Sequence, residues 1–257
     1  MEALFPVLFV AFLALIIVAG YFAAQAAKKR REQLAALAAE LGFQYLPEGL
    51  KRDVPSGFWA SLSAAFEAGP EQGFIQRFHG FTPFGQGHSP DVANLIAGRR
   101  GDADWLIFDY TYKVTTSNGK TTQTTTHPYG VVAVRVPLVF PVLSLTAENV
   151  FHRIGSKLGM KELTFELEEF NRRYFIRGED ARAAHDLLHP RAIEYLMAHP
   201  VRTWQFGGPM LLIIKGGFYD PLEVRRVMEE IDGFLKLVPE YVREDRGFAA
   251  KWSSPLQ

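Results

Sequence analysis

The chain has 257 residues, with 28 basic and 28 acidic side chains and no cysteine. The lack of cysteine excludes structural disulfides, thiolate zinc sites and a cysteine nucleophile. Because a nucleic-acid-binding protein presents a strongly basic face, the balanced charge argues against nucleic acid as a partner.

The N-terminal segment is apolar and uncharged over residues 3–27, and four basic residues follow it directly: Lys28, Lys29, Arg30 and Arg31. About 20 apolar residues in a helix cross the roughly 30 Å hydrocarbon core of a bilayer. We therefore predict a transmembrane helix with a basic flank over residues 1–31. A cleaved secretory signal is the alternative, with Ala24-Gln25-Ala26 as its cleavage site. The apolar run is longer than a signal core, however, and no basic residue precedes it.

The basic flank also predicts an orientation. Lysine and arginine next to a membrane span are retained on the cytoplasmic side. We therefore expect a single-pass protein of the cell membrane, with its N-terminus exported and its C-terminal domain in the cytoplasm. In this position the four bases attract anionic headgroups, each contributing about 1 kcal/mol. The lipid bilayer is thus the first predicted partner.

Residues 32–46 are predicted to form a juxtamembrane helix and a lead-in to the following domain. Leucines recur at helical spacing up to Leu41, and Gly42 is a natural C-terminal stop. No glycine or proline interrupts the chain between Tyr21 and Leu41, so we expect the membrane helix to continue here as one rod. A separate short helix on the membrane surface is the alternative.

Residues 47–257 predict one soluble α+β domain, in which helices flank an antiparallel sheet. The first part, residues 47–92, is rich in proline, glycine and serine and is expected to be turn-rich chain, packed through its aromatic residues. Further along, strands alternate with helices through hairpins rather than through regular crossovers, which is typical of α+β architecture.

An aromatic strand is predicted over residues 104–114, where side chains alternate between two faces. Leu106, Phe108 and Tyr110 share the face that we expect to be buried, and Asp109 falls on the other. We expect Asp109 to face solvent or to pair with a basic residue on a neighbouring strand. A role of this carboxylate in binding a ligand is the alternative.

A hairpin turn is predicted at Asn118-Gly119, which suits a two-residue loop. In the register that this turn sets, Val132 and Val134 of the returning strand lie on the opposite face from Phe108. A slip of one residue exchanges the two faces, and proline cannot donate to the ladder. We therefore predict a β-bulge or a strand break around His127-Pro128.

The remaining elements follow from apolar periodicity, caps and turn residues. They are buried extended chain over 136–145, a helix near 147–158, a strand pair at 161–167 and 172–177, helices over 179–188 and 190–197, a hairpin of 203–206 with 210–215 around Gly207-Gly208, and a last helix over 220–238 capped by Asp220.

Two pairs of histidines are the candidate metal or catalytic residues. His185 and His189 stand four apart on a predicted helix, which is the spacing of one metal-binding face, but the glutamate of the HisGluXxxXxxHis pattern is missing. His189 also precedes a proline at a helix end, where imidazole commonly bonds carbonyls. His79 and His88 lie in a glycine-rich loop with Asp91 nearby, and solvation there is the simpler interpretation.

Several short stretches of the body carry a resemblance to a known family: Ala38–Phe43, Ala93–Tyr112, Glu169–Ile176, Leu187–Leu196 and Trp204. Together they resemble an uncharacterised bacterial family of single-span membrane proteins that carry a domain of unknown function. The resemblance implies an N-terminal anchor and a soluble α+β domain, and the family supplies no catalytic or binding residues.

We interpret the chain as a membrane-anchored, non-enzymatic binding or scaffolding protein without a cofactor. Besides lipid, its expected partner is another membrane protein or a peptide, and the threonine-rich stretch Thr121–Thr126 is a predicted contact surface. The alternative is a membrane-tethered hydrolase or metal-dependent enzyme that uses His185 and His189 or the loop of His79 and His88.

Overall fold

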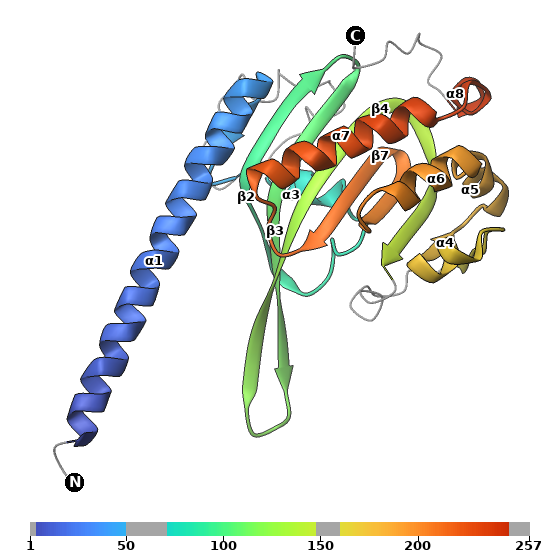
Figure 1. The fold of residues 1–257 in the computed structure, drawn as a ribbon. Helices are drawn as coiled ribbons and strands as arrows, with labels where there is room; N and C mark the ends of the chain where they lie inside the picture. Colours follow the sequence, from blue (N-terminus) through green and yellow to red (C-terminus); the bar gives the residue numbers. More distant parts are fainter. Residues whose placement is uncertain (1–3, 50–70, 148–159, 247–257) are drawn as a thin grey trace.

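The computed structural model describes residues 4–49, 71–147 and 160–246, which form a long N-terminal helix, an antiparallel sheet and several shorter helices (Figure 1). The predicted α+β class is confirmed. In chain order the elements are α1 (Leu4–Leu41), β1 (Gln44–Leu46), α3 (Glu71–Gln76), β2 (His88–Arg100), β3 (Ala103–Ser117), β4 (Thr122–Ala147), β5 (Lys161–Glu162), α4 (Glu168–Arg173), β6 (Tyr174–Gly178), α5 (Ala181–Leu187), α6 (Pro190–Ala198), β7 (Thr203–Gly216), α7 (Pro221–Leu237) and α8 (Glu240–Arg246).

Helix α1 runs without a break for 38 residues, which confirms the predicted rod. Within the described residues, one helix is long and apolar enough to cross a membrane, over Phe12–Leu41. Its large apolar side chains at Phe9 and from Phe12 to Phe22 are exposed, and from Leu34 onwards apolar side chains enter the core of the body. The apolar half of α1 therefore projects away from the sheet, as Figure 1 shows.

The C-terminal end of α1 is part of the body rather than a separate lead-in. Gly42 has a φ of +70° and closes the helix, and the N–H of Phe43 bonds the carbonyl of Ala38 in a Schellman motif. The side chains of Leu34, Leu37, Ala38 and Phe43 join one core cluster with the sheet. The predicted stop at Gly42 is thereby confirmed.

The sheet has the strand order β1-β2-β3-β4-β6-β5, and β7 pairs with β4. All of these ladders are antiparallel. The 26-residue strand β4 is the organising element, because its first part pairs with β3 and its last part with β6. The extended chain predicted over residues 136–145 is the second part of this strand.

The register between β3 and β4 is continuous, and the predicted bulge at His127-Pro128 is wrong. The ladder runs from Asp104↔Arg135 to Ser117↔Thr122 without a shift, and the hairpin loop has four residues instead of two. The side chain of Asn118 accepts hydrogen bonds from the N–H groups of Lys120 (3.1 Å) and Thr121 (2.9 Å) and so shapes this longer loop.

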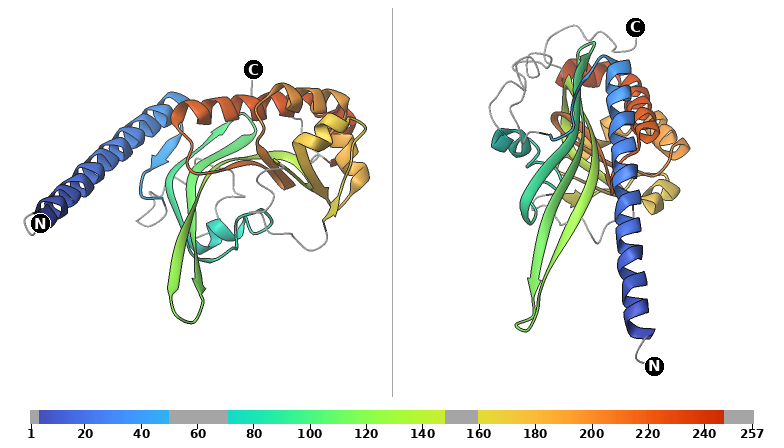
Figure 2. Two further views of the ribbon diagram at one scale, coloured as in Figure 1. Left: turned by 60° about the horizontal axis from the view of Figure 1, so that its bottom comes forward. Right: turned by 90° about the vertical axis from the view of Figure 1, so that its left-hand side faces the viewer.

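The alternation of side chains between the two faces of β4 does not have to change at a bulge, because both faces of the sheet are buried. Trp105, Ile107, Val132 and Val134 pack under α1, α5, α6 and α7, so the assumption of one polar face was wrong. The other face, with Phe108, is covered by phenylalanines of the segment that we predicted to be turn-rich: Phe74, Phe78, Phe81 and Phe84. Figure 2 (left) shows the helices on one side of the sheet and α3 on the other.

The β3–β4 hairpin extends beyond the body as a two-stranded arm, which we define as residues 113–126 (Figure 1). Strand β2 pairs with β3 no further than Lys113, and beyond it neither strand of the arm has a second partner among the described strands. Every residue from Thr115 to Thr126 is exposed. The threonine-rich stretch Thr121–Thr126 is therefore accessible.

Residues 203–216 form one strand, β7, and the predicted hairpin around Gly207-Gly208 is wrong. The strand stays paired with β4 on both sides of the two glycines, and a register shift absorbs the irregularity. Gly208 has a φ of +54°, and the phenyl ring of Phe81 lies 3.4 Å from where a Cβ on Gly207 would stand. The glycines thus permit a bulge and a close approach rather than a chain reversal.

The predicted helices of the C-terminal part are confirmed with shifted ends. Asp180 caps α5, Pro190 opens α6, and Asp220 forms a capping box with Glu223 at the start of α7. Helix α8 was not predicted. The helix expected near 147–158 lies outside the described residues except for Ala147, which ends β4.

Candidate functional site

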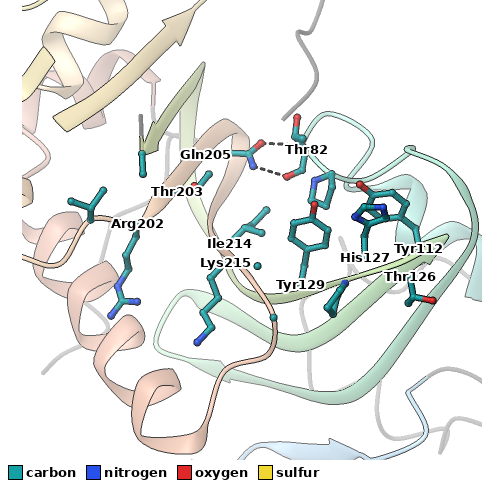
Figure 3. A pocket seen from close by; sticks show the side chains of 16 residues that line it. Thr82, Tyr112, Thr126, His127, Tyr129, Arg202, Thr203, Gln205, Ile214 and Lys215 are labelled. Atoms are coloured by element: carbon teal, nitrogen blue, oxygen red, sulfur yellow. Dashed lines mark hydrogen bonds between the residues drawn. The ribbon is translucent and has the colours of Figure 1, made fainter. Parts of the chain in front are cut away.

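An open cavity of about 870 Å³ lies at the base of the arm, bordered by β4, β7 and the segment around Thr82 (Figure 3). Its inner rim is fixed by Gln205, whose side-chain amide donates to the carbonyl of Thr82 (2.6 Å) and accepts from its N–H (2.8 Å). This paired contact holds the phenylalanine-rich segment onto the sheet and gives the cavity a defined wall.

One wall of the cavity is an aromatic stack. Tyr112 and His127 are cross-strand partners, and their rings are nearly parallel at 5.0 Å between centroids. Tyr129 stacks on the same tyrosine at 5.8 Å. The Tyr112 hydroxyl donates to the side chain of Gln86 at 2.9 Å, which fixes the ring. His127 and Tyr129 are half-buried, so their rings remain available to a flat ligand.

Two basic residues border the other end of the cavity, and each is paired with a carboxylate of α7. Lys215 contacts Glu223 at 2.7 Å, and Arg202 forms a two-pronged contact with Glu230 at 2.6 and 3.0 Å. The pair with Glu223 uses one of the three donors of the lysine ammonium. The lysine side chain is about one-third exposed. The Lys215 ammonium lies over the Tyr219 ring, on the face of the sheet opposite to Tyr112 and Tyr129. The cavity therefore combines a flat aromatic wall with two cations whose charges are already paired.

The histidines predicted as metal or catalytic residues do not converge. The His185 ring packs on the Phe165 ring at 4.4 Å between centroids. His189 contacts the carbonyl of Leu237 through Nε2 at 2.8 Å, a contact that requires the proton on that nitrogen. His88 contacts Ser89 and Thr115, and His79 lies apart in the turn after α3. In the described ranges no group of three or more potential ligands could hold a metal ion.

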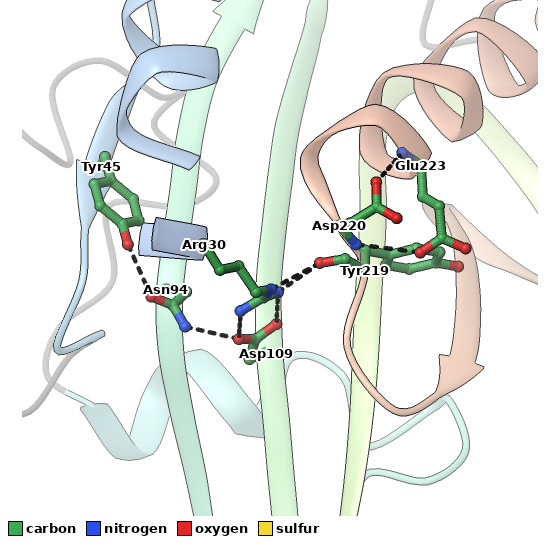
Figure 4. A network of polar contacts seen from close by, with 7 residues as sticks. All are labelled: Arg30, Tyr45, Asn94, Asp109, Tyr219, Asp220 and Glu223. Atoms are coloured by element: carbon green, nitrogen blue, oxygen red, sulfur yellow. Dashed lines mark hydrogen bonds and ion pairs between the residues drawn. The ribbon is translucent and has the colours of Figure 1, made fainter. Parts of the chain in front are cut away.

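A second polar centre joins α1 to the body (Figure 4). Arg30 makes a bidentate contact with Asp109 at 2.7 and 2.9 Å, and the same guanidinium donates to the carbonyl of Tyr219 at 2.7 and 3.0 Å. The carboxylate also accepts from the Asn94 side chain at 2.7 Å, and that amide accepts from the Tyr45 hydroxyl at 2.8 Å. We call this network the Arg30 clamp.

The clamp changes the interpretation of two predictions. Asp109 does pair with a basic residue, but the partner lies on α1 rather than on a neighbouring strand, and the carboxylate is buried. Arg30 is turned towards the sheet and packs over the Phe218 ring at 5.4 Å, so it does not serve as a headgroup-facing base. Lys28, Lys29 and Arg31 remain exposed.

A groove of about 580 Å³ between the end of α1 and α7 contains a buried carboxylate, Asp232. One oxygen lies 3.7 Å from Arg100, and the other has no hydrogen-bond partner among the described residues. Burial raises the pKa of Asp232 to about 6, although Arg100 and Lys236 act in the opposite direction and Glu229 adds to the rise.

This shift predicts a pH dependence of stability. The folded state binds a proton on Asp232 more tightly than the unfolded state, whose pKa is near 3.8. The contribution of this group to stability is therefore fully present below about pH 4 and is lost as the pH rises through about 6. Asp232→Asn is expected to stabilise the protein at pH 7 by about 1–2 kcal/mol. This gain is smaller than the full pKa shift implies, because the variant also loses the solvent-screened attraction between the carboxylate and Arg100.

Denaturant unfolding of parent and Asp232→Asn at pH 4 and pH 7 tests this expectation. The advantage of the asparagine variant should disappear at pH 4, where the parent carboxyl is protonated. An advantage of equal size at both pH values would contradict it.

Comparison of the chain with protein-family models, curated proteins and solved structures gives no match. The resemblance to a family of single-span membrane proteins stays a prediction. The cavity and the Arg30 clamp are thus interpreted from their own chemistry.

Proposed function

We propose that this chain is a membrane-anchored binding protein, whose cavity takes a flat aromatic molecule. Helix α1 crosses the cell membrane with its N-terminus exported, and the body lies on the cytoplasmic side. The observation that carries the binding role is the cavity itself, in which Tyr112, His127 and Tyr129 form a stacked aromatic wall. Concave sites with an apolar wall and a few placed polar groups are the usual form of small-molecule sites.

The exposed bases support the proposed orientation. Lys28 and Lys29 lie directly after the apolar run, and bases in that position remain in the cytoplasm. An enzyme that uses His185 and His189 has less support, because the two rings contact Phe165 and the Leu237 carbonyl instead of a common centre. Binding therefore fits the described geometry better than hydrolysis or metal chemistry.

Two sulfonate probes, one flat and one not, test the proposal. We expect 2-naphthalenesulfonate to bind full-length protein in nanodiscs, and cyclohexanesulfonate to bind at least fivefold more weakly, because only a flat aromatic ring stacks on His127 and Tyr129. His127→Ala should weaken binding of the naphthalene probe about fivefold, which corresponds to about 1 kcal/mol. Saturation-transfer NMR, with empty nanodiscs subtracted, measures both affinities.

His79→Ala is the matched control, since this histidine is exposed in the turn after α3 and is not among the residues that line the cavity. It should leave the affinity for 2-naphthalenesulfonate unchanged. Equal affinity for both probes, or an affinity for 2-naphthalenesulfonate that His127→Ala does not alter, would show that the aromatic wall is not the site.

A further inference from the structure

The arm and the apolar part of α1 leave the body from the same point. The Arg30 clamp joins α1 to β3 at Asp109, and both elements continue from this contact. Strand β3 reaches Ser117 about 26 Å further on, at about 3.3 Å per residue. Helix α1 reaches Leu4 about 39 Å further on, at about 1.5 Å per residue. In Figure 1 and in the right-hand view of Figure 2 both point to the same side of the body.

The clamp makes this arrangement rigid. The guanidinium of Arg30 contacts β3 and the β7–α7 loop at once, and Leu34 and Leu37 of the following turns are buried. A helix held by a bidentate ion pair and an apolar seam cannot swing freely about its base. If α1 enters a bilayer, as the proposed function requires, the arm is therefore brought towards the same bilayer.

Hydrocarbon cannot accept the arm. Its residues from Thr115 to Thr126 are threonine, serine, asparagine, glycine, lysine and glutamine, and all are exposed. A two-stranded ribbon also has open edges with unpaired backbone groups, which lipid tails cannot satisfy. The arm must therefore stay outside the hydrocarbon core.

The length of the apolar run allows this. The apolar part of α1, residues 4–27, is about 36 Å long, which exceeds the roughly 30 Å core, and a tilt of about 34° removes the excess. When α1 tilts so that the body comes closer to the membrane surface, the rigidly attached arm rotates towards the plane of the membrane. The span can then remain in hydrocarbon while the arm lies along the headgroups.

The charge of the arm identifies the headgroups that it fits. Lys113 and Lys120 are its two charged residues, and the sequence from Tyr110 to Arg135 contains no aspartate or glutamate. Lysines near a membrane surface are attracted to anionic lipids. Threonine hydroxyls can donate hydrogen bonds to phosphate oxygens.

We propose that the β3–β4 arm is a second membrane contact, which lies in the headgroup layer and prefers anionic lipids. This inference rests on the proposed anchoring by α1. The contact fixes the rotation of the body and places the cavity at the base of the arm close to the membrane surface.

A single labelled cysteine tests the contact, since the chain has none of its own. Gln123→Cys in the arm carries a nitrobenzoxadiazole fluorophore, and full-length protein is assembled in phosphatidylglycerol or phosphatidylcholine nanodiscs. We expect dithionite to reduce this label at least threefold more slowly in phosphatidylglycerol than in phosphatidylcholine. Lys113→Gln with Lys120→Gln should abolish most of the difference. Tyr241→Cys, at an exposed position of α8, is the control and should show no lipid dependence.

The two proposals fail in different ways. If α1 does not anchor the chain, the protein will not co-elute with nanodiscs of either lipid. If the chain co-elutes but the label at position 123 is reduced as fast as the label at 241 in both lipids, the arm does not contact headgroups. Protection at position 123 that is equal in both lipids and unaffected by the lysine variants would also overturn the preference for anionic lipid.

Discussion

Replacement of Arg30 by alanine is expected to lower the free energy of unfolding of the body by about 3–4 kcal/mol. In this variant Asp109 remains buried, and among the described residues only the Asn94 amide still donates a hydrogen bond to it. The Tyr219 carbonyl also loses the two hydrogen bonds that it accepts from Arg30. A buried carboxylate without its counter-ion is costly because the interior solvates charge poorly. Denaturant unfolding of the full-length protein in detergent, followed by circular dichroism, measures the loss.

Three comparison variants separate the clamp from a general effect of basic charge. Lys29→Ala removes an exposed neighbouring base and should change stability by less than about 0.5 kcal/mol. Arg30→Lys should recover only part of the loss, because an ammonium cannot form the two-pronged contact. Arg30→Met combined with Asp109→Leu should cost less than Arg30→Ala alone, since the buried charge is then gone. An Arg30→Ala variant as stable as Lys29→Ala would show that the clamp contributes nothing.

The basic flank shows what the sequence could and could not predict about this centre. The pattern of four bases after an apolar run indicates a membrane boundary, and it gives all four the same role. Arg30 is separated from Asp109 by 79 positions in the chain, and only the packing of α1 on the sheet brings the two together. The local signal was the carboxylate itself, because an acid in an aromatic strand requires a partner.

The aromatic wall of the cavity was not predicted for the same reason, because it also depends on residues that are distant in the sequence. Tyr112 and His127 become neighbours only when the hairpin register is known, and the expected two-residue turn pairs them with other residues. Strand β3 itself, the long helix α7 and its cap at Asp220 could be predicted because periodicity and caps are local. Burial of both sheet faces depends on which segments cover them, and the consecutive valines at 131 and 132 were its sequence signal.

Gly98→Ala is expected to destabilise the protein by about 1–3 kcal/mol, although it adds one methyl group. A Cβ at this position of β2 would lie 2.2 Å from Cδ1 of Phe43. The phenyl ring is buried and follows the Schellman turn that closes α1, so it cannot move without disturbing the junction between α1 and the sheet. Thermal unfolding of the full-length protein in detergent measures the effect.

Gly80→Ala is the matched control, because a Cβ there meets nothing within 4 Å. A double-mutant cycle with Phe43→Leu distinguishes a clash from a loss of backbone freedom. The smaller side chain makes room for the methyl group, so Gly98→Ala should cost less in the Phe43→Leu background than in the parent. An equal cost in both backgrounds would mean that the ring is not what excludes a side chain at position 98, and that α1 is not held to the sheet through this contact.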